Sequence, residues 1–213
     1  VLDRTKEHGS SQPLYLDVRD AFYNSDIKPI IVGGRYGLSS KDTTPGQILS
    51  VFENLKLKEP KNDFTIGITD DVTYKSLVKS EEIDLNQDIT ECVFYGLGSD
   101  GTVSANKNSI KIIGDMTDNY IQGFFSYDSK KAGGLTRSYL RISKNVIKLP
   151  YLIQKPNFVV CTNFSYITKY DMLEDIREGG TFLLNTLYDE KTVVDKLPDN
   201  VKKTLATKNI KMY

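Results

Sequence analysis

The second half of the chain alternates short apolar runs with segments in which apolar residues recur every three or four positions. Runs of four to eight apolar residues between turn formers are typical of buried strands, and helical spacing is typical of amphipathic helices. The sequence therefore predicts strands at 92–95, 120–127, 135–142, 158–161, 181–184 and 210–213, and helices at 102–113, 167–176 and 192–207, the last interrupted by a proline. Strands that alternate with helices predict an α/β domain with a mixed, largely parallel sheet and flanking helices.

The first part of the chain has a weaker pattern. It predicts short strands at 1–4, 30–32 and 64–68. Residues 5–29 are polar and rich in turn formers, so we expect an extended connection there. A helix is expected after Thr44, which suits an N-cap, because Pro45 suits the first helical turn.

An acidic, weakly patterned stretch at 69–90 separates these two parts, and we expect the domain linker there. The predicted domains are residues 1–90 and 91–213. The chain begins at Val1 inside a predicted strand and ends at Tyr213 in another, which leads us to expect a piece of a longer protein.

Composition narrows the classes of function. Lys and Arg total 28, and Asp and Glu also total 28, so the formal net charge is zero and a nucleic-acid partner is not expected. The sequence shows neither a membrane-length apolar run nor a signal peptide, so we expect a cytoplasmic protein without a membrane partner. His8 is the only histidine, and Cys92 and Cys161 are the only cysteines, too few for a multi-histidine or four-cysteine metal site.

The best local signal for chemistry is the sequence Gly96-Leu97-Gly98-Ser99-Asp100-Gly101, which fits G-x-G-x-x-G. It stands between a predicted strand and a helix that begins near Thr102, where backbone N–H groups and the helix dipole stabilise a phosphate. The alternative is a glycine turn that only lets strand and helix pack closely.

Two further segments have the composition of anion sites. Lys130 and Lys131, after a predicted strand, would suit a phosphorylated ribose, whereas the neighbouring Asp128 would suit a free ribose hydroxyl. Arg35 and Lys41 flank a glycine- and serine-rich turn before the first helix. A solvated charged turn explains Lys130 and Lys131 at least as well, and the alternative for Arg35 and Lys41 is an ordinary strand-to-helix turn.

These segments together resemble pyruvate:ferredoxin (flavodoxin) oxidoreductases. The stretch 96–114, with 127–134, 169–173 and 179–185, is similar to the gamma domain of that family. Residues 1–7 and 13–15 resemble the end of its transketolase-C-terminal-like domain, and residues 33–41 resemble the connection that follows. The chain departs from the family pattern at Ser104, near His8, at Tyr139 and at 162–163, which puts local contacts in doubt.

The resemblance implies an enzyme that decarboxylates pyruvate on thiamine diphosphate with Mg²⁺ and passes electrons through [4Fe-4S] clusters to ferredoxin or flavodoxin. It would transfer the acetyl group to coenzyme A and act as a homodimer. Because the gamma domain of the family is associated with coenzyme A, we expect this segment to contribute coenzyme A contacts and inter-domain structure. The expected contacts are Gly98, Ser99, Asp100, Gly101, Thr102, Asn106, Lys107, Lys130, Lys131, Arg35 and Lys41.

Two other functions stay open at this point. One is a purely structural inter-domain module, and the other is an NAD(P)-binding module. The segment carries no thiamine motif and no cluster of cysteines, so no catalytic residue is expected in it.

Overall fold

The chain folds into two compact units, Val1–Leu85 and Asn86–Tyr213, each with its own hydrophobic core. The computed structural model describes residues 1–213 except 5–10, 70, 85–87 and 129–133. The boundary between the units falls inside the acidic stretch 69–90. The assignment of the first unit to a transketolase-C-terminal-like domain stays a prediction.

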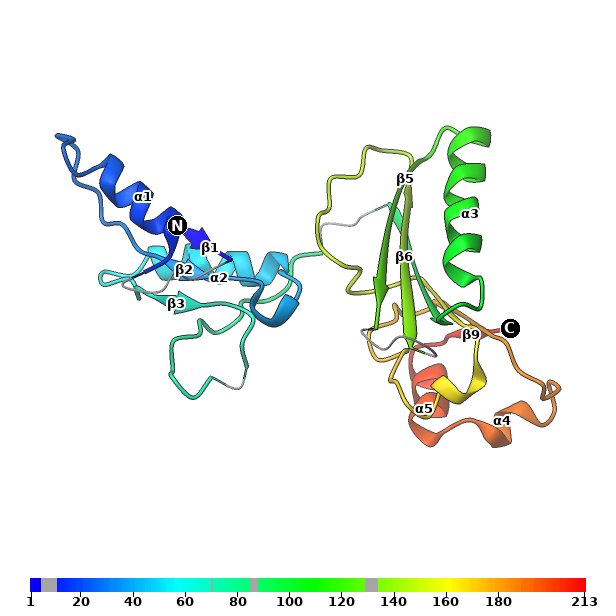
Figure 1. The fold of residues 1–213 in the computed structure, drawn as a ribbon. Helices are drawn as coiled ribbons and strands as arrows, with labels where there is room; N and C mark the ends of the chain where they lie inside the picture. The colour runs from blue at the N-terminus through cyan, green and yellow to red at the C-terminus, as the bar shows by residue number, and fades with distance from the viewer. Residues whose placement is uncertain (5–10, 70, 85–87, 129–133) are drawn as a thin grey trace. The chain divides into compact units, whose positions relative to one another are not determined.

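The first unit is built on a small parallel sheet in the order β1-β2-β3 (Figure 1). Its elements are β1 (Leu2–Asp3), α1 (Pro13–Ala21), β2 (Gly34–Arg35), the 3-10 turn η1 (Leu38–Ser40), α2 (Pro45–Leu55) and β3 (Phe64–Thr65). Val32, Val51, Phe64 and Ile66 form its buried core. The helix predicted after Thr44 is confirmed, and the backbone N–H of Thr44 donates to Gln47 Oε1 at 3.4 Å.

Two predictions for this unit are wrong. Helix α1 lies within the expected extended connection, because Pro13 starts a helix there rather than a turn, and the helix buries only Tyr15. The strand expected at 30–32 is absent from the described residues, and Ile30 is 77% exposed. Pairing begins instead at Gly34, where a Cβ would stand 2.2 Å from the ring of Phe64, so only glycine allows that approach.

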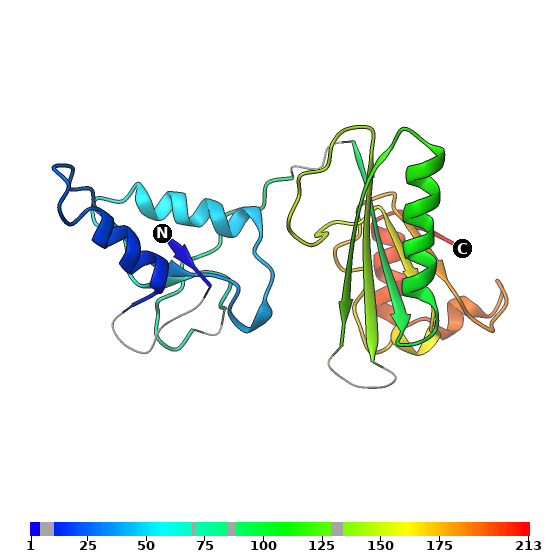
Figure 2. The same cartoon turned by 45° about the horizontal axis from the view of Figure 1, so that its top comes forward.

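The second unit contains a six-stranded sheet in the order β5-β6-β4-β7-β8-β9 (Figure 2). The strands are β4 (Ile89–Leu97), β5 (Tyr120–Tyr127), β6 (Leu135–Ser143), β7 (Phe158–Cys161), β8 (Thr181–Leu184) and β9 (Lys211–Met212). Strands β4, β7, β8 and β9 run parallel, and β6 is antiparallel to both β4 and β5. The expected mixed, largely parallel sheet is confirmed.

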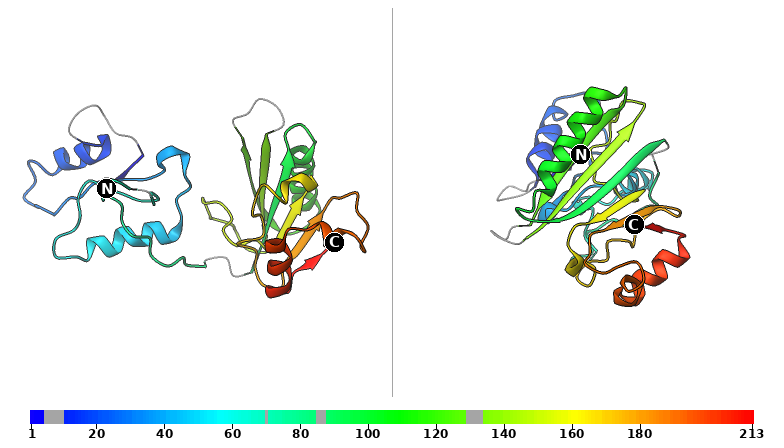
Figure 3. Two further views of the ribbon diagram at one scale, coloured as in Figure 1. Left: turned by 90° about the horizontal axis from the view of Figure 1, so that it is seen from below. Right: turned by 90° about the vertical axis from the view of Figure 1, so that its right-hand side faces the viewer.

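The two faces of this sheet are covered by different parts of the chain. Helix α3 (Thr102–Met116) packs against β5, β6 and β4 on one face, where a Cβ on Gly123 would meet Ile110 at 2.4 Å. The segment 164–176 and the helices α4 (Val193–Lys196) and α5 (Asp199–Thr207) cover the other face (Figure 3). Val159, Phe182 and Leu173 are almost fully buried in the core beneath them.

The helix predicted at 167–176 is wrong. The structure has a 3-10 turn, η2 (Phe164–Tyr166), followed by turns and bends. Ile167, Leu173 and Ile176 are nevertheless buried, so the apolar spacing reflects packing on the sheet rather than a helix. None of the helices in the described part of the chain is long and apolar enough to cross a membrane.

A buried ionic network holds the amino end of β4. Glu91, with no exposed surface, accepts a hydrogen bond from Arg141 Nε at 2.8 Å and lies 3.4 Å from a terminal nitrogen of Arg177. Arg141 also donates to Gln122 Oε1 and to the Tyr151 carbonyl, each at 2.8 Å. The network therefore joins three strands to the connection between β6 and β7.

Candidate functional site

The glycine loop lies where the sequence predicts it, between β4 and α3. A Cβ on Gly96 would stand 2.8 Å from the Thr102 side chain, so this glycine is required for the close approach of strand and helix. The Gly98 N–H donates to the Gly134 carbonyl at 2.8 Å, which joins the loop to the start of β6. Gly101 precedes α3 with φ +88°, a conformation that favours glycine.

The carboxylate of Asp100 accepts from two backbone N–H groups of this loop. It accepts hydrogen bonds from the backbone N–H groups of Leu97 and Thr102, each at 2.8 Å, and from the Thr162 hydroxyl at 2.9 Å. Burial alone would raise the pKa of Asp100, but these hydrogen bonds outweigh it and lower the pKa. A diphosphate at this loop would have to displace the carboxylate or bind around it.

The carboxyl ends of the parallel strands meet at this loop. The Thr162 N–H, directly after β7, donates to the Tyr95 carbonyl at 3.0 Å. Asn185, directly after β8, donates through its side chain to the Thr162 carbonyl at 3.0 Å. Helix α3 leaves β4 toward one face and the chain after β7 toward the other, which makes this the switch point where ligands of open α/β sheets bind.

A small hollow of about 250 Å³ lies at the same edge of the sheet. It is lined by Ser126, Tyr127, Asp128, Leu135, Arg137 and Tyr170. The Arg137 guanidinium lies 5.4 Å from the centroid of the Tyr95 ring. Sequence reasoning missed Arg137 and Thr162, although the position of Thr162 directly after a strand is a signal that could have found it.

The structure brings some of the predicted contacts together and separates others. Gly98, Ser99, Asp100, Gly101 and Thr102 share the loop, and Ser99 has φ +74°. On α3, Asn106 is buried and its amide donates to the Thr102 carbonyl at 2.9 Å, so it supports the first turn of the helix. The ammonium group of Lys107 lies 5.4 Å from the centroid of the Phe125 ring.

The remaining predicted cations lie elsewhere. Lys130 and Lys131 are outside the described residues. Arg35 and Lys41 belong to the first unit: Arg35 is in β2, and Lys41 is exposed after η1. Arg35 helps to lower the pKa of Asp63, although the hydrogen bond from Lys75 contributes most.

The second unit is thus an α/β domain with a glycine-rich loop at the carboxyl edge of its parallel strands. A family model described as "Pyruvate ferredoxin/flavodoxin oxidoreductase" matches residues 91–213. The chain belongs to this family, and the resemblance noted in the sequence is confirmed.

Relatives with this family name align with the whole chain. It is 54% identical to "Pyruvate-flavodoxin oxidoreductase" of Enterobacter agglomerans and 52% identical to "Pyruvate:ferredoxin oxidoreductase" of Moorella thermoacetica, and covers 18% of each of those proteins. A solved pyruvate oxidoreductase subunit from Thermotoga maritima aligns with 52% of this chain and 57% of its own, at 22% identity and a TM-score of 0.44. The chain thus spans less than a fifth of the length of these two relatives.

Proposed function

We propose that the chain is part of an enzyme that oxidatively decarboxylates pyruvate to acetyl-coenzyme A and CO₂ and passes the electrons to ferredoxin or flavodoxin. The family match over residues 91–213 carries this proposal. The names of the relatives, which include both flavodoxin and ferredoxin forms, support it. A cytoplasmic homodimer is the proposed state of the full enzyme.

Thiamine diphosphate, Mg²⁺ and [4Fe-4S] clusters would supply carbanion stabilisation and electron transfer in that enzyme. The residues of this chain do not fit such clusters. Burial raises the pKa of both Cys92 and Cys161 to about 11, which opposes the thiolate form that iron requires. We therefore place the iron–sulfur clusters outside residues 1–213.

For the second unit we propose a part in binding coenzyme A. The observation that carries this proposal is the position of the glycine loop at the switch point between β4 and β7, beside the N-terminus of α3. There the loop and Thr162 would position the diphosphate arm, and Lys107 would add a cation on α3. Lys130 and Lys131 stay proposed partners of the phosphorylated ribose, and Arg35 and Lys41 stay proposed anion contacts of the first unit.

A purely structural role is the second candidate, and one observation favours it. Asp100 already satisfies two backbone N–H groups of the loop, and its negative charge repels a diphosphate. In this case the loop serves only to join β4, α3 and β7.

Titration of the chain with coenzyme A, desulfo-coenzyme A, NADP⁺ and NAD⁺ separates the proposals. Asp100→Asn keeps the side-chain volume and removes the charge, and Asp115→Asn at the opposite end of α3 is the matched control. If the loop binds a diphosphate, Asp100→Asn keeps its fold and binds coenzyme A more tightly or with altered salt dependence. Asp115→Asn then binds like the unchanged chain.

A structural role gives a different result in the same samples. Asp100→Asn then loses about 0.5–1 kcal/mol of helix-end stability with no ligand effect at all. That outcome would remove the coenzyme A proposal for this loop. Preferential binding of NADP⁺ or NAD⁺ would favour the dinucleotide-binding module instead.

A further inference from the structure

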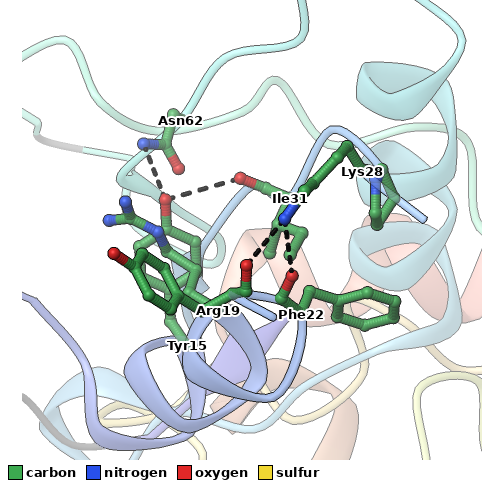
Figure 4. Close-up of a pocket in the computed structure, with 8 residues that line it drawn as sticks. Tyr15, Arg19, Phe22, Lys28, Ile31 and Asn62 are labelled. Atoms are coloured by element: carbon green, nitrogen blue, oxygen red, sulfur yellow. Dashed lines mark hydrogen bonds between the residues drawn. The ribbon is translucent and has the colours of Figure 1, made fainter. Parts of the chain in front are cut away.

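A hollow in the first unit presents two cations and several aromatic rings to solvent (Figure 4). It has a volume of about 550 Å³ and lies between the end of α1, the loop that follows it and Asn62. Its lining is Tyr15, Arg19, Phe22, Tyr23, Lys28, Pro29, Ile31 and Asn62, which includes no carboxylate. The hollow is wide open to solvent, so it would enclose a ligand only in part.

Both cations are held in place and still have hydrogen-bond donors left. The ammonium group of Lys28 donates to the carbonyls of Tyr23 at 2.6 Å and Phe22 at 3.4 Å, at the end of α1 (Figure 4). An ammonium group has three donors, so one remains. The guanidinium of Arg19 lies 5.5 Å from the centroid of the Tyr15 ring. Among the described residues neither cation forms an ion pair.

One aromatic ring of the hollow, that of Tyr15, is fixed by hydrogen bonds. The hydroxyl of Tyr15 donates to the Ile31 carbonyl at 3.4 Å and accepts from Asn62 Nδ2 at 3.3 Å. Asn62 in turn accepts from the Gly33 N–H at 2.8 Å, so its amide orientation is set by the backbone. Tyr15 is 7% exposed, whereas Tyr23 at the rim is 75% exposed and can stack on an entering ring.

We propose that this hollow binds a planar aromatic anion of the size of a nucleoside monophosphate. Arg19 and Lys28 would pair with the phosphate, because guanidinium and ammonium groups form charge-assisted hydrogen bonds with its oxygens. The rings of Tyr23 and Phe22 would cover the base, since stacking on an aromatic side chain tolerates any base. The lack of carboxylates in the lining makes the hollow a poor site for a metal cation. This proposal does not rest on the proposed coenzyme A site of the second unit.

The test uses the whole chain and three probes: adenosine 5′-monophosphate, adenosine and inorganic phosphate. Binding is followed by amide chemical-shift changes in two-dimensional NMR spectra. We expect the nucleotide to bind more tightly than either of the other probes, with shift changes at residues 15–31 and at Asn62. Shift changes confined to 96–107 would overturn the proposal and point to the loop of the second unit instead.

Four variants locate the site. Arg19→Gln and Lys28→Gln each remove one cation, and each should raise the Kd for the nucleotide about tenfold. Lys58→Gln, which removes an exposed cation of the same unit outside the hollow, should leave the Kd unchanged. Arg19→Lys keeps the charge but loses the planar fork and should recover part of the affinity.

Two further results would overturn the proposal. The first is a Kd no lower for the nucleotide than for phosphate or adenosine. The second is an equal loss of affinity in Lys58→Gln, which would mean that only the overall charge of the unit matters. Because Lys28 also caps α1, thermal melts of each variant show whether the helix survives, and Arg19→Gln decides the matter if Lys28→Gln unfolds.

Discussion

The buried network at the amino end of β4 should make a single carboxylate important for the stability of the second unit. Glu91 is fully buried and accepts from Arg141 at 2.8 Å, while the side chain of Arg141 is 5% exposed. Removing one partner of such a pair leaves the other charge buried without compensation, which costs about 3–5 kcal/mol. Glu91→Gln keeps the shape and some hydrogen bonding, so we expect the lower end of that range, about 3 kcal/mol.

Hydrogen exchange measured by mass spectrometry tests this for each unit separately. A loss of about 3 kcal/mol corresponds to roughly 100-fold faster exchange in peptides from β4, β6 and β7, because about 1.4 kcal/mol is a factor of ten. Peptides from the first unit should be unchanged. Glu53→Gln is the matched control, since the Glu53–Lys56 pair is exposed on α2 and is worth less than about 1 kcal/mol.

A double-mutant cycle separates the ion pair from general damage to the core. Arg141→Met alone should be at least as harmful as Glu91→Gln. The double variant should be less destabilised than the sum of the two single variants, since neither charge is then left without its partner. Exchange in Glu91→Gln within about 0.5 kcal/mol of the unchanged chain would refute the reasoning.

Four further outcomes are expected. The pKa of Asp100 is lowered, so the stability that its carboxylate contributes is present above the ordinary carboxyl pKa and is lost as the pH falls through the lowered value. Protection factors of the amides at the start of α3, corrected for the slower intrinsic exchange in acid, should therefore fall over that range, and Asp100→Asn should lose that pH dependence. Gly34→Ala should destabilise the first unit by about 1–3 kcal/mol in denaturant melts, because the new Cβ collides with Phe64, whereas a loss below about 0.5 kcal/mol would contradict this packing. Cys92 and Cys161 should resist a thiol reagent at pH 8 until the chain unfolds, since burial raises the pKa of both thiols to about 11, and rapid labelling of the native chain would count against that burial. The chain alone should reduce no dye with pyruvate and coenzyme A, and any measurable turnover would be a contrary result.

The strands of the second unit could be predicted closely from the sequence, and the irregular parts could not. Strands β5, β7 and β8 have the predicted bounds, because each is a short apolar run that ends at a turn former. Apolar residues of the segment 167–176 recur at helical spacing, but they are buried by contact with the sheet, which a local pattern does not distinguish from a helix. Helix α1 escaped prediction because turn formers such as Pro13 and Pro29 flank it, and because Tyr15 is its only buried residue.

The candidate site could also be predicted only in part from the sequence. The position of the glycine loop between a strand and a helix follows from local sequence, and it is confirmed. The hydrogen bonds that Asp100 accepts could not be predicted from local sequence, because one of the donors, Thr162, is 62 residues away and lies near Asp100 only in the folded sheet. Arg137 was missed because an arginine inside a predicted strand gives no sign that it lines a hollow at the sheet edge.

Strand β4 joins the buried ionic network to the glycine loop in the second unit. Its amino end is tied to two other strands by Glu91 and Arg141, and its carboxyl end runs into the glycine loop. The buried charges lie in the amino half of the strand, so the stability of the core does not depend on the short, polar loop at the other end. A ligand that displaced Asp100 would break three hydrogen bonds at the carboxyl end and leave the network around Glu91 intact. Amide hydrogen exchange at the loop should therefore respond to ligand and to Asp100→Asn. Amide hydrogen exchange in β6 should respond independently, to Glu91→Gln.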